Sequence, residues 1–172
     1  MTGPAGRTQV LRSPEETEAH AAAFARSLPA GGDRALIVAL IGVLGAGKTT
    51  WARGFLLTSG AGGRVSSPTY ALLETYSLPA LTVAHLDLYR IGTAADLEML
   101  GLRDLDEPGH VWLIEWPERG AGVLPDPDLE IRLVPEGAGR RVTVLARGER
   151  GQAWLQAADS RLPQQTPGSD HA

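Results

Sequence analysis

The sequence predicts an α/β protein with three α/β/α layers around a mixed, mainly parallel sheet. The first observation is RALIVALIG, a short continuous apolar run between turn signals, which is typical of a fully buried strand. The second is its continuation, because a glycine-rich segment and then the helical pattern TTWARGFLLTSG follow it directly. The third is a later apolar run, HVWLIEW, which indicates another buried strand. Strands that are buried on both faces need helices on each side of the sheet.

Composition excludes several classes of protein. The chain has 172 residues, 43% of them hydrophobic, and a formal net charge of −4. This suits one globular domain and argues against a free-standing nucleic-acid binder, which normally has a basic surface. The absence of cysteine excludes disulfides, thiol nucleophiles and cysteine-based metal sites. No secretory signal or membrane-spanning run is visible, so we expect a cytoplasmic protein without membrane contact.

The first third of the chain is expected to hold two helices around the buried strand. Residues 1–12 have no clear pattern and are expected to be flexible. The segment SPEETEAHAAAFARSL predicts a helix in which Ser13 caps the N-terminus, Pro14 suits the first turn and Glu16 completes a capping box. PAGGD ends that helix, and the helix after the buried strand is expected to end at Gly60.

The later elements are mostly strands. YALLETYS and LTVAHLDLY predict two strands joined by a turn around Pro79, and TAADLEMLGL predicts a helix capped by Thr93. LEIRLVP and RRVTVLAR alternate apolar and polar residues around residues 136–140, which indicates a hairpin. We expect one domain over residues 13–157. Residues 158–172 are rich in Gln, Pro, Ser and Asp, and they predict a disordered tail.

The segment GVLGAGKTT matches the Walker A pattern in its expected context of strand, loop and helix, and so predicts a P-loop NTPase. Its glycines let backbone N–H groups curl around phosphates, and the helix start adds a positive dipole end. Lys48 is the only lysine among 16 basic residues, and its compact ammonium can reach between the β- and γ-phosphates, which a wider guanidinium would not do in the same way. The alternative is a flexible turn with a surface lysine. The loop residues expected to bind the nucleotide are Gly42, Gly45, Ala46, Gly47, Lys48, Thr49 and Thr50.

Two acidic residues stand where predicted strands end. LTVAHLD ends at Asp87 and VWLIE ends at Glu115. The carboxyl ends of the strands line the phosphate site in such a fold, so Asp87 is a candidate to hold Mg²⁺ together with Thr49, and Glu115 a candidate metal ligand that could also orient the attacking water. With Lys48, these are the expected catalytic residues. The alternative is that each acid only marks the place where its strand leaves the sheet and enters solvent.

Other polar residues give weaker signals. In SSPTY, Ser66, Ser67 or Thr69 could sense the γ-phosphate, although ordinary turn chemistry explains the segment at least as well. The histidines show no ligand spacing, so no structural metal site is predicted. His85 alternates with Asp87 along its strand and could lie near the site, but a packed or hydrogen-bonded histidine is the simpler interpretation.

The motifs SPEET, GVLGAGKTT, SPTY, HLDLYR, DLEMLGL and IEWPE occur in one order over residues 13–145. This order resembles the bacterial TsaE (YjeE) family, the ATPase of tRNA threonylcarbamoyladenosine biosynthesis. The resemblance implies Mg²⁺-dependent ATP hydrolysis within a complex with TsaD and TsaB subunits, which modifies adenosine 37 of tRNAs that read codons starting with A. It implies contact with tRNA through that complex, and it places Trp116 close to the nucleotide.

One position departs from the family pattern. The family usually has an acid at the second loop position, where this chain has Val43, so any charge or hydrogen-bond role of that acid is missing. Two other functions are alternatives on the residues alone, and the second is excluded. A small-molecule kinase would share the loop and the Mg²⁺ site, but it would need an acceptor pocket and an arginine-rich lid, and Arg140 and Arg141 fall in a predicted turn. A GTP-dependent switch needs an N-K-x-D motif, which a chain with one lysine does not have.

Overall fold

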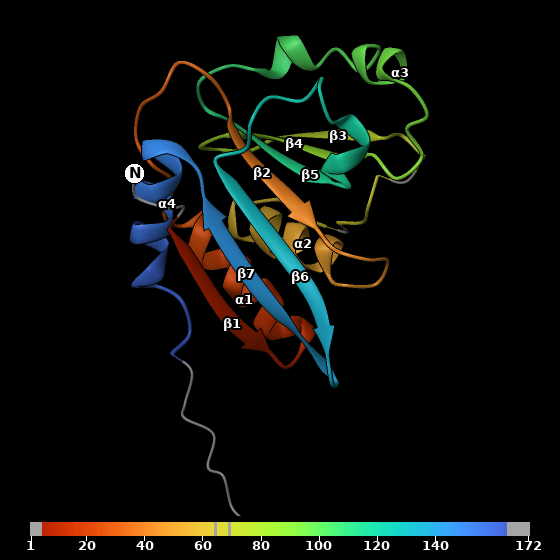
Figure 1. The fold of residues 1–172 in the computed structure, drawn as a ribbon. Helices are drawn as coiled ribbons and strands as arrows, with labels where there is room; N and C mark the ends of the chain where they lie inside the picture. The colour runs from red at the N-terminus through yellow and green to blue at the C-terminus, as the bar shows by residue number, and fades with distance from the viewer. Residues whose placement is uncertain (1–4, 64, 69, 165–172) are drawn as a thin grey trace, which may run out of the picture.

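The computed structural model describes residues 5–63, 65–68 and 70–164, and it contains one sheet of seven strands in the order β1-β7-β6-β2-β5-β4-β3 (Figure 1). The strands are β1 (Gly6–Leu11), β2 (Leu36–Ile41), β3 (Leu73–Ser77), β4 (Thr82–Asp87), β5 (His110–Glu115), β6 (Leu129–Glu136) and β7 (Gly139–Ala146). The helices are α1 (Pro14–Ala25), α2 (Lys48–Thr58), α3 (Ala94–Glu98) and α4 (Gly148–Asp159), with 3-10 helices η1 (Leu102–Leu105) and η2 (Pro117–Gly120). Within these described residues, no helix is long and apolar enough to cross a membrane.

The centre of the sheet is parallel and its outer pairings are antiparallel. Strands β6, β2, β5 and β4 pair in parallel, while β3, β7 and β1 join antiparallel to their neighbours. The predicted α/β class and mixed sheet are therefore confirmed. The two predicted hairpins are also present, as β3–β4 and β6–β7. The carboxyl ends of β2, β4 and β5 meet at one edge, next to the start of α2.

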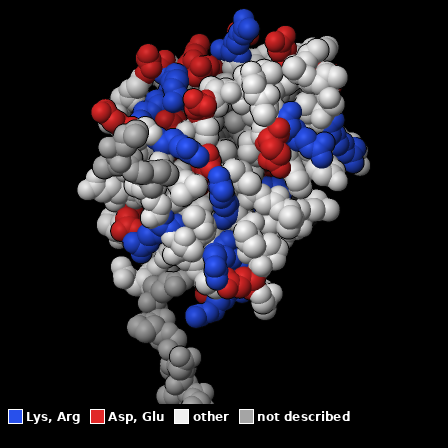
Figure 2. All heavy atoms as spheres, viewed as in Figure 1, with Lys and Arg blue, Asp and Glu red and all other residues white. Residues whose placement is uncertain are grey.

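Helices cover the two faces of the sheet unequally. On one face, α1, α2 and α4 enclose a core with an aromatic centre made of Phe24, Trp51, Phe55 and Trp154. On the other face, α3 and the 3-10 helices cover β2, β4 and β5 only, around a second core with Leu97, Trp112 and Ile114. The antiparallel strands β6 and β7 alternate buried and open positions, so their outer face is in contact with solvent. Basic and acidic side chains intermix on that face (Figure 2).

The N-terminal segment differs from its prediction. Residues 1–12 were expected to be flexible, but Gly6–Leu11 forms β1 at the edge of the sheet, antiparallel to β7. Gln9 and Leu11 are buried there. The partners of β1 lie 129 to 139 residues away in the sequence, so local patterning does not reveal this strand.

The C-terminal segment is also more ordered than predicted, as far as it is described. Helix α4 continues to Asp159, and Ala158 and Leu162 are buried in the main core at 0% and 3% exposure. The side-chain amide of Gln9 donates a hydrogen bond of 3.0 Å to the carbonyl of Pro163. The expected disorder is therefore wrong for residues 158–163. The buried side chains of Ala158 and Leu162 hold this segment against the core. The prediction missed them because the segment as a whole is mainly polar. Residues 165–172 of the expected tail lie outside the described residues.

The caps follow the predicted residues with one change. The Ser13 hydroxyl accepts a hydrogen bond from the backbone N–H of Glu16 at 3.1 Å, as expected for the cap of α1. The Glu16 carboxylate accepts from the N–H of Arg12, one residue before the cap, at 2.7 Å. Thr93 and Asp96 form a full capping box on α3. These bonds satisfy N–H groups that a helix start leaves open.

A buried histidine joins α1 to α2. His20 is fully buried, and its Nδ1 accepts a hydrogen bond from Trp51 Nε1 at 2.9 Å. Burial lowers the pKa of His20 from 6.5 to about 4, and the positive charge of Arg7 acts in the same direction. Protonation would charge the ring in an apolar site and remove the acceptor that Trp51 uses.

We expect His20 to make the free energy of unfolding depend on pH. Because its folded-state pKa is depressed, the unfolded chain binds the extra proton between pH 6.5 and about 4, and stability falls as pH drops through this window. The loss should approach about 3 kcal/mol near pH 4. Urea unfolding at several pH values, in the parent and in His20→Asn, measures it. Asn keeps an acceptor for Trp51 and does not titrate, so parallel pH profiles of the two proteins would contradict this expectation.

Leu162 should stabilise the fold although it follows the last helix. Leu162→Ala removes a side chain that is 3% exposed, and it should lower the free energy of unfolding by about 2–3 kcal/mol. The matched control is Leu57→Ala in α2, where the side chain is 41% exposed and the loss should be well below that. Urea unfolding of the parent and both variants measures the two losses in the free energy of unfolding. Equal losses would show that Leu162 does not pack as described.

Candidate functional site

A cavity of about 490 Å³ opens at the carboxyl ends of β2, β4 and β5, in front of the first turn of α2. Its walls come from the glycine-rich loop, from the segments that follow β4 and β5, and from the start of β7. The lining residues are Leu44, Gly45, Gly47, Lys48, Thr49, Thr50, Ser67, Asp87, Tyr89, Arg90, Glu115, Trp116 and Arg140. Most of the residues that the sequence singled out therefore lie around one cavity.

The glycine-rich loop turns sharply between β2 and α2. Gly45 and Gly47 have backbone φ angles of +78° and +108°, which residues other than glycine rarely adopt. A Cβ atom at Gly47 would also meet the guanidinium of Arg140, so a larger residue there would have to displace that side chain. Helix α2 begins at Lys48 without a side-chain cap. The N–H groups of its first turn have no partner within the helix, and they are directed at the loop.

Lys48 is buried and its ammonium is tied to the loop itself. Its Nζ donates to the carbonyls of Gly42 at 2.6 Å and Val43 at 3.0 Å, and it lies 4.1 Å from the centre of the Trp116 ring. Burial lowers the pKa of Lys48, while the carboxylates of Glu115, Glu118 and Asp87 act in the opposite direction. The carbonyls and the ring thus stabilise a cation where an anionic ligand would otherwise do so.

Asp87 and Glu115 lie opposite one another at the ends of two parallel strands. They are 7% and 3% exposed. Glu115 Oε1 accepts a hydrogen bond from the hydroxyl of Thr49 at 2.8 Å. Ser67 Oγ donates to Asp87 Oδ2 at 2.6 Å and lies 3.4 Å from Glu115 Oε2. Neither acid is exposed to solvent at the end of its strand. Hydroxyl groups from two other segments, those of Thr49 and Ser67, point at the two carboxylates.

Some predicted residues lie differently from the expectation. Ala46 does not line the cavity, because its methyl group packs into the core and its N–H donates to the carbonyl of Val43 at 3.0 Å. Gly42 takes part through its carbonyl only. The side chain of Val43, where the family pattern has an acid, is 60% exposed and outside the cavity lining. Of the three hydroxyl residues in SSPTY, Ser67 reaches the acids, Ser66 is exposed, and Thr69 lies outside the described residues.

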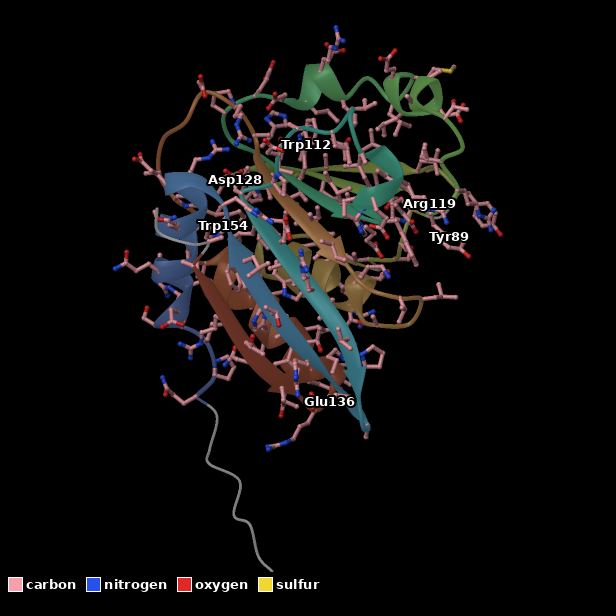
Figure 3. All side chains as sticks on the ribbon, in the orientation of Figure 1. Tyr89, Trp112, Arg119, Asp128, Glu136 and Trp154 are labelled. Atoms are coloured by element: carbon pink, nitrogen blue, oxygen red, sulfur yellow. The ribbon has the colours of Figure 1, made fainter. Side chains whose placement is uncertain are left out.

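Trp116 has an unusual backbone conformation at the mouth of the cavity. Its φ of +59° is in the left-handed region, which is rare for a bulky side chain and indicates local strain. This conformation turns the ring back over Lys48 and against Tyr89, with ring centroids 5.0 Å apart. The guanidinium of Arg119 also lies over the Tyr89 ring, at 5.6 Å (Figure 3). Tyr89 and Trp116 line the cavity on the side of β4 and β5.

Three residues were missed or undervalued at the level of sequence. Arg140 was assigned to a turn, but it points from the start of β7 at the loop, donates to the carbonyl of Ala46 at 3.3 Å and has a buried Nε that lacks a partner among the described residues. Tyr89 had no signal of its own. His85 is fully buried, and its Nε2 lies 2.7 Å from Glu115 Oε2, so the alternation with Asp87 was a real signal.

The oxygen donors at this cavity fit a hard cation that shares its coordination with phosphates. No group of three or more His, Asp or Glu residues able to hold a metal by themselves occurs in the described part of the chain. Mg²⁺ at nucleotide sites needs only one or two protein oxygens, because water and phosphate supply the rest. Thr49, Asp87 and Glu115 supply such oxygens within one hydrogen-bonded group.

Comparisons with known proteins agree with one another. Residues 11–143 match the family model described as threonylcarbamoyl adenosine biosynthesis protein TsaE. The chain is similar to tRNA threonylcarbamoyladenosine biosynthesis protein TsaE from Haemophilus influenzae, with 38% identity over 73% of this chain and 79% of the relative. The protein of that name from Bacillus subtilis is 37% identical over 80% of this chain and 84% of the relative. Among solved structures, YdiB from Bacillus subtilis superposes with a TM-score of 0.74 at 25% identity, covering 93% of this chain and 98% of the other.

Lys48 should be irreplaceable in the binding of a nucleoside triphosphate. Lys48→Ala removes the ammonium, and Lys48→Arg puts a wider group into a site closed by two carbonyls and the Trp116 ring. We expect both variants to bind ATP at least about tenfold more weakly than the parent. Isothermal titration measures it. The control is Arg53→Ala, on α2 but outside the cavity lining, where Arg53 pairs with Glu18 of α1. Parental affinity in the arginine variant would show that the shape of the cation is unimportant.

Proposed function

The chain belongs to the TsaE family, and from this premise and the geometry of the cavity we propose that it is a Mg²⁺-dependent ATP hydrolase. In this proposal it is the ATP-hydrolysing component of the complex that forms N6-threonylcarbamoyladenosine at position 37 of tRNAs reading A-starting codons. The observation that supports it most is the convergence of a Walker A loop with two buried acids, Asp87 and Glu115, at one edge of the sheet. A nucleotide hydrolase requires this combination of phosphate binding, metal ligation and water orientation.

The loop and Lys48 bind the triphosphate in this proposal. The N–H groups at the start of α2 and the helix dipole favour anions at the loop. Lys48 leaves the carbonyls of Gly42 and Val43 and neutralises the β- and γ-phosphates. Its charge is then satisfied by phosphate oxygens, so the change replaces two hydrogen bonds to neutral carbonyls by bonds in which donor and acceptor are both charged. Arg140 approaches the loop from the other side and adds a second positive charge.

Thr49, Asp87 and Glu115 provide the oxygens that would hold Mg²⁺ and order the attacking water. When bound, Mg²⁺ supplies charge neutralisation between the β- and γ-phosphates. Thr49 and Ser67 donate hydrogen bonds to Glu115 and Asp87, and these bonds preset the directions of the carboxylates. Glu115 lies deeper than Thr49, and its carboxylate accepts hydrogen bonds. It can therefore orient a water molecule by accepting a hydrogen bond from it, and can then accept the proton of that water. The Trp116–Tyr89 ring pair limits the access of other water.

We propose that TsaD- and TsaB-type subunits are the partners, that the complex works in the cytoplasm, and that tRNA contact is made chiefly by the partners. The exposed face of β6 and β7 has several arginines (Figure 2). However, Arg132 and Arg147 pair with Glu130 at 2.9 and 2.7 Å, and Arg141 pairs with Glu136 at 2.6 Å. With a net charge of −4 in addition, this surface offers few free cations for RNA phosphates. Nucleotide occupancy would favour one state of the assembly, and hydrolysis would end that preference.

ATP turnover of the parent and of two acid variants tests this function. Glu115→Gln should lower kcat by about 100-fold or more while ATP still binds, and Asp87→Asn should weaken the Mg²⁺-dependent part of nucleotide binding. Each protein is assayed alone and with purified TsaD, TsaB and tRNA. The control is Glu98→Gln, an exposed acid on α3 whose change should leave turnover unaltered. Turnover at the parental rate in both acid variants would overturn the proposed roles, and a parent without ATPase activity under any of these conditions would overturn the function.

A further inference from the structure

His85 and Glu115 form a buried pair that the proposed chemistry has not yet used. The two side chains are 0% and 3% exposed, and Nε2 of His85 lies 2.7 Å from Oε2 of Glu115. His85 is too deeply buried to touch a ligand in the cavity, and it does not line it. We propose that His85 is a positioning residue that holds the Glu115 carboxylate in its working orientation. This inference rests on the proposed ATPase function for its catalytic consequence.

The position of His85 follows from the strand register. His85 and Asp87 are two residues apart on β4, so both side chains point to the face of the sheet that α2 covers. Asp87 pairs with Glu115 on the neighbouring parallel strand β5, and His85 pairs with Leu113. The imidazole therefore lies one step below the acids, inside the protein, and reaches the inner oxygen of Glu115. Because His85 is fully buried, its ring cannot rotate away without displacing the side chains packed around it.

The other donors to Glu115 come from segments that face the cavity. Thr49 Oγ1 donates to Oε1 at 2.8 Å, and Ser67 Oγ lies 3.4 Å from Oε2. Thr49 is the second residue of α2 and is itself a proposed metal ligand, and Ser67 belongs to a loop and bonds more closely to Asp87 at 2.6 Å. A ligand in the cavity competes for both hydroxyls. His85 is the donor to Glu115 that a ligand cannot reach, so it keeps one oxygen fixed while the other is free to act.

The second ring nitrogen supports a role beyond packing. A carboxylate oxygen accepts, so Nε2 of His85 bears the hydrogen of this bond. Nδ1 is buried and lacks a hydrogen-bond partner within the described residues. An apolar side chain of similar size would fill the space without this unsatisfied atom. Among the residues that the structure describes, the one polar contact of the ring is therefore the one to Glu115, and this contact is what the histidine adds to the site.

Two substitutions separate positioning from packing. His85→Leu fills the space without a donor, whereas His85→Gln places an amide N–H donor close to the position of Nε2. We expect the leucine variant to lose about 10- to 100-fold in kcat, as partners of ligand side chains typically do when removed. Its affinity for ADP without Mg²⁺ should equal that of the parent, and the gain in affinity on adding Mg²⁺ should be smaller. The glutamine variant should recover most of both quantities.

The controls keep the outcome decisive. His110→Leu, at the opposite end of β5, should leave kcat and the Mg²⁺-dependent gain unchanged, and circular dichroism melts correct every rate for the folded fraction. Nitrogen-15 NMR of the imidazoles in the parent should show His85 with a slowly exchanging proton on Nε2. Parental kcat in His85→Leu, or equal damage in the leucine and glutamine variants, would overturn the positioning role. If the parent hydrolyses no ATP, the proposed function fails, while the NMR and the metal-dependent ADP affinity still test the His85–Glu115 pair.

Discussion

The parallel pairing of β4 with β5 places two carboxylates, Asp87 and Glu115, next to one another in a nearly dry part of the protein. Two carboxylates on neighbouring strands repel one another when both are charged. Burial of each charge also costs free energy unless hydrogen bonds or cations compensate for it. The surroundings provide that compensation: Thr49, Ser67 and His85 donate hydrogen bonds, and the Lys48 ammonium lies in the same cavity. The functional groups of the site are therefore held in place by the need to keep these two acids satisfied.

The glycine-rich loop depends on the same arrangement from the other side. Lys48 is buried at 5% exposure, and its ammonium bonds to Gly42 and Val43 and contacts the Trp116 ring. Trp116 directly follows Glu115, and its left-handed backbone brings its ring over the lysine. A ligand that draws Lys48 away from its carbonyls would change the environment of Trp116 and of the acids together. The loop, the acids and the ring thus respond to a ligand as one unit.

The sequence predicted the parts of the site that depend on local patterns and on the geometry of parallel strands. Asp87 and Glu115 were predicted together because parallel strands end at the same edge, and the Walker A loop was predicted from its spacing. Arg140 was not predicted to lie at the site. Its approach to Gly47 depends on the pairing of β7 with β6 and β1 and on the fact that Gly47 has no Cβ atom. The strand β1 and the buried Leu162 were missed for a similar reason: their partners are far away in the chain. His85 had a period-two signal, but only the three-dimensional register shows that it meets Glu115.

A crystal structure with Mg²⁺ and a non-hydrolysable ATP analogue tests the central claim most directly, because it shows the ligand, the loop and the acids at once. The account predicts that the triphosphate lies in the cavity, that Lys48 Nζ has exchanged the carbonyls of Gly42 and Val43 for phosphate oxygens, and that Mg²⁺ lies among Thr49, Asp87 and Glu115. It also predicts that His85 still donates to Glu115. A nucleotide bound elsewhere, or a bound nucleotide with Lys48 still on the two carbonyls, would contradict the account.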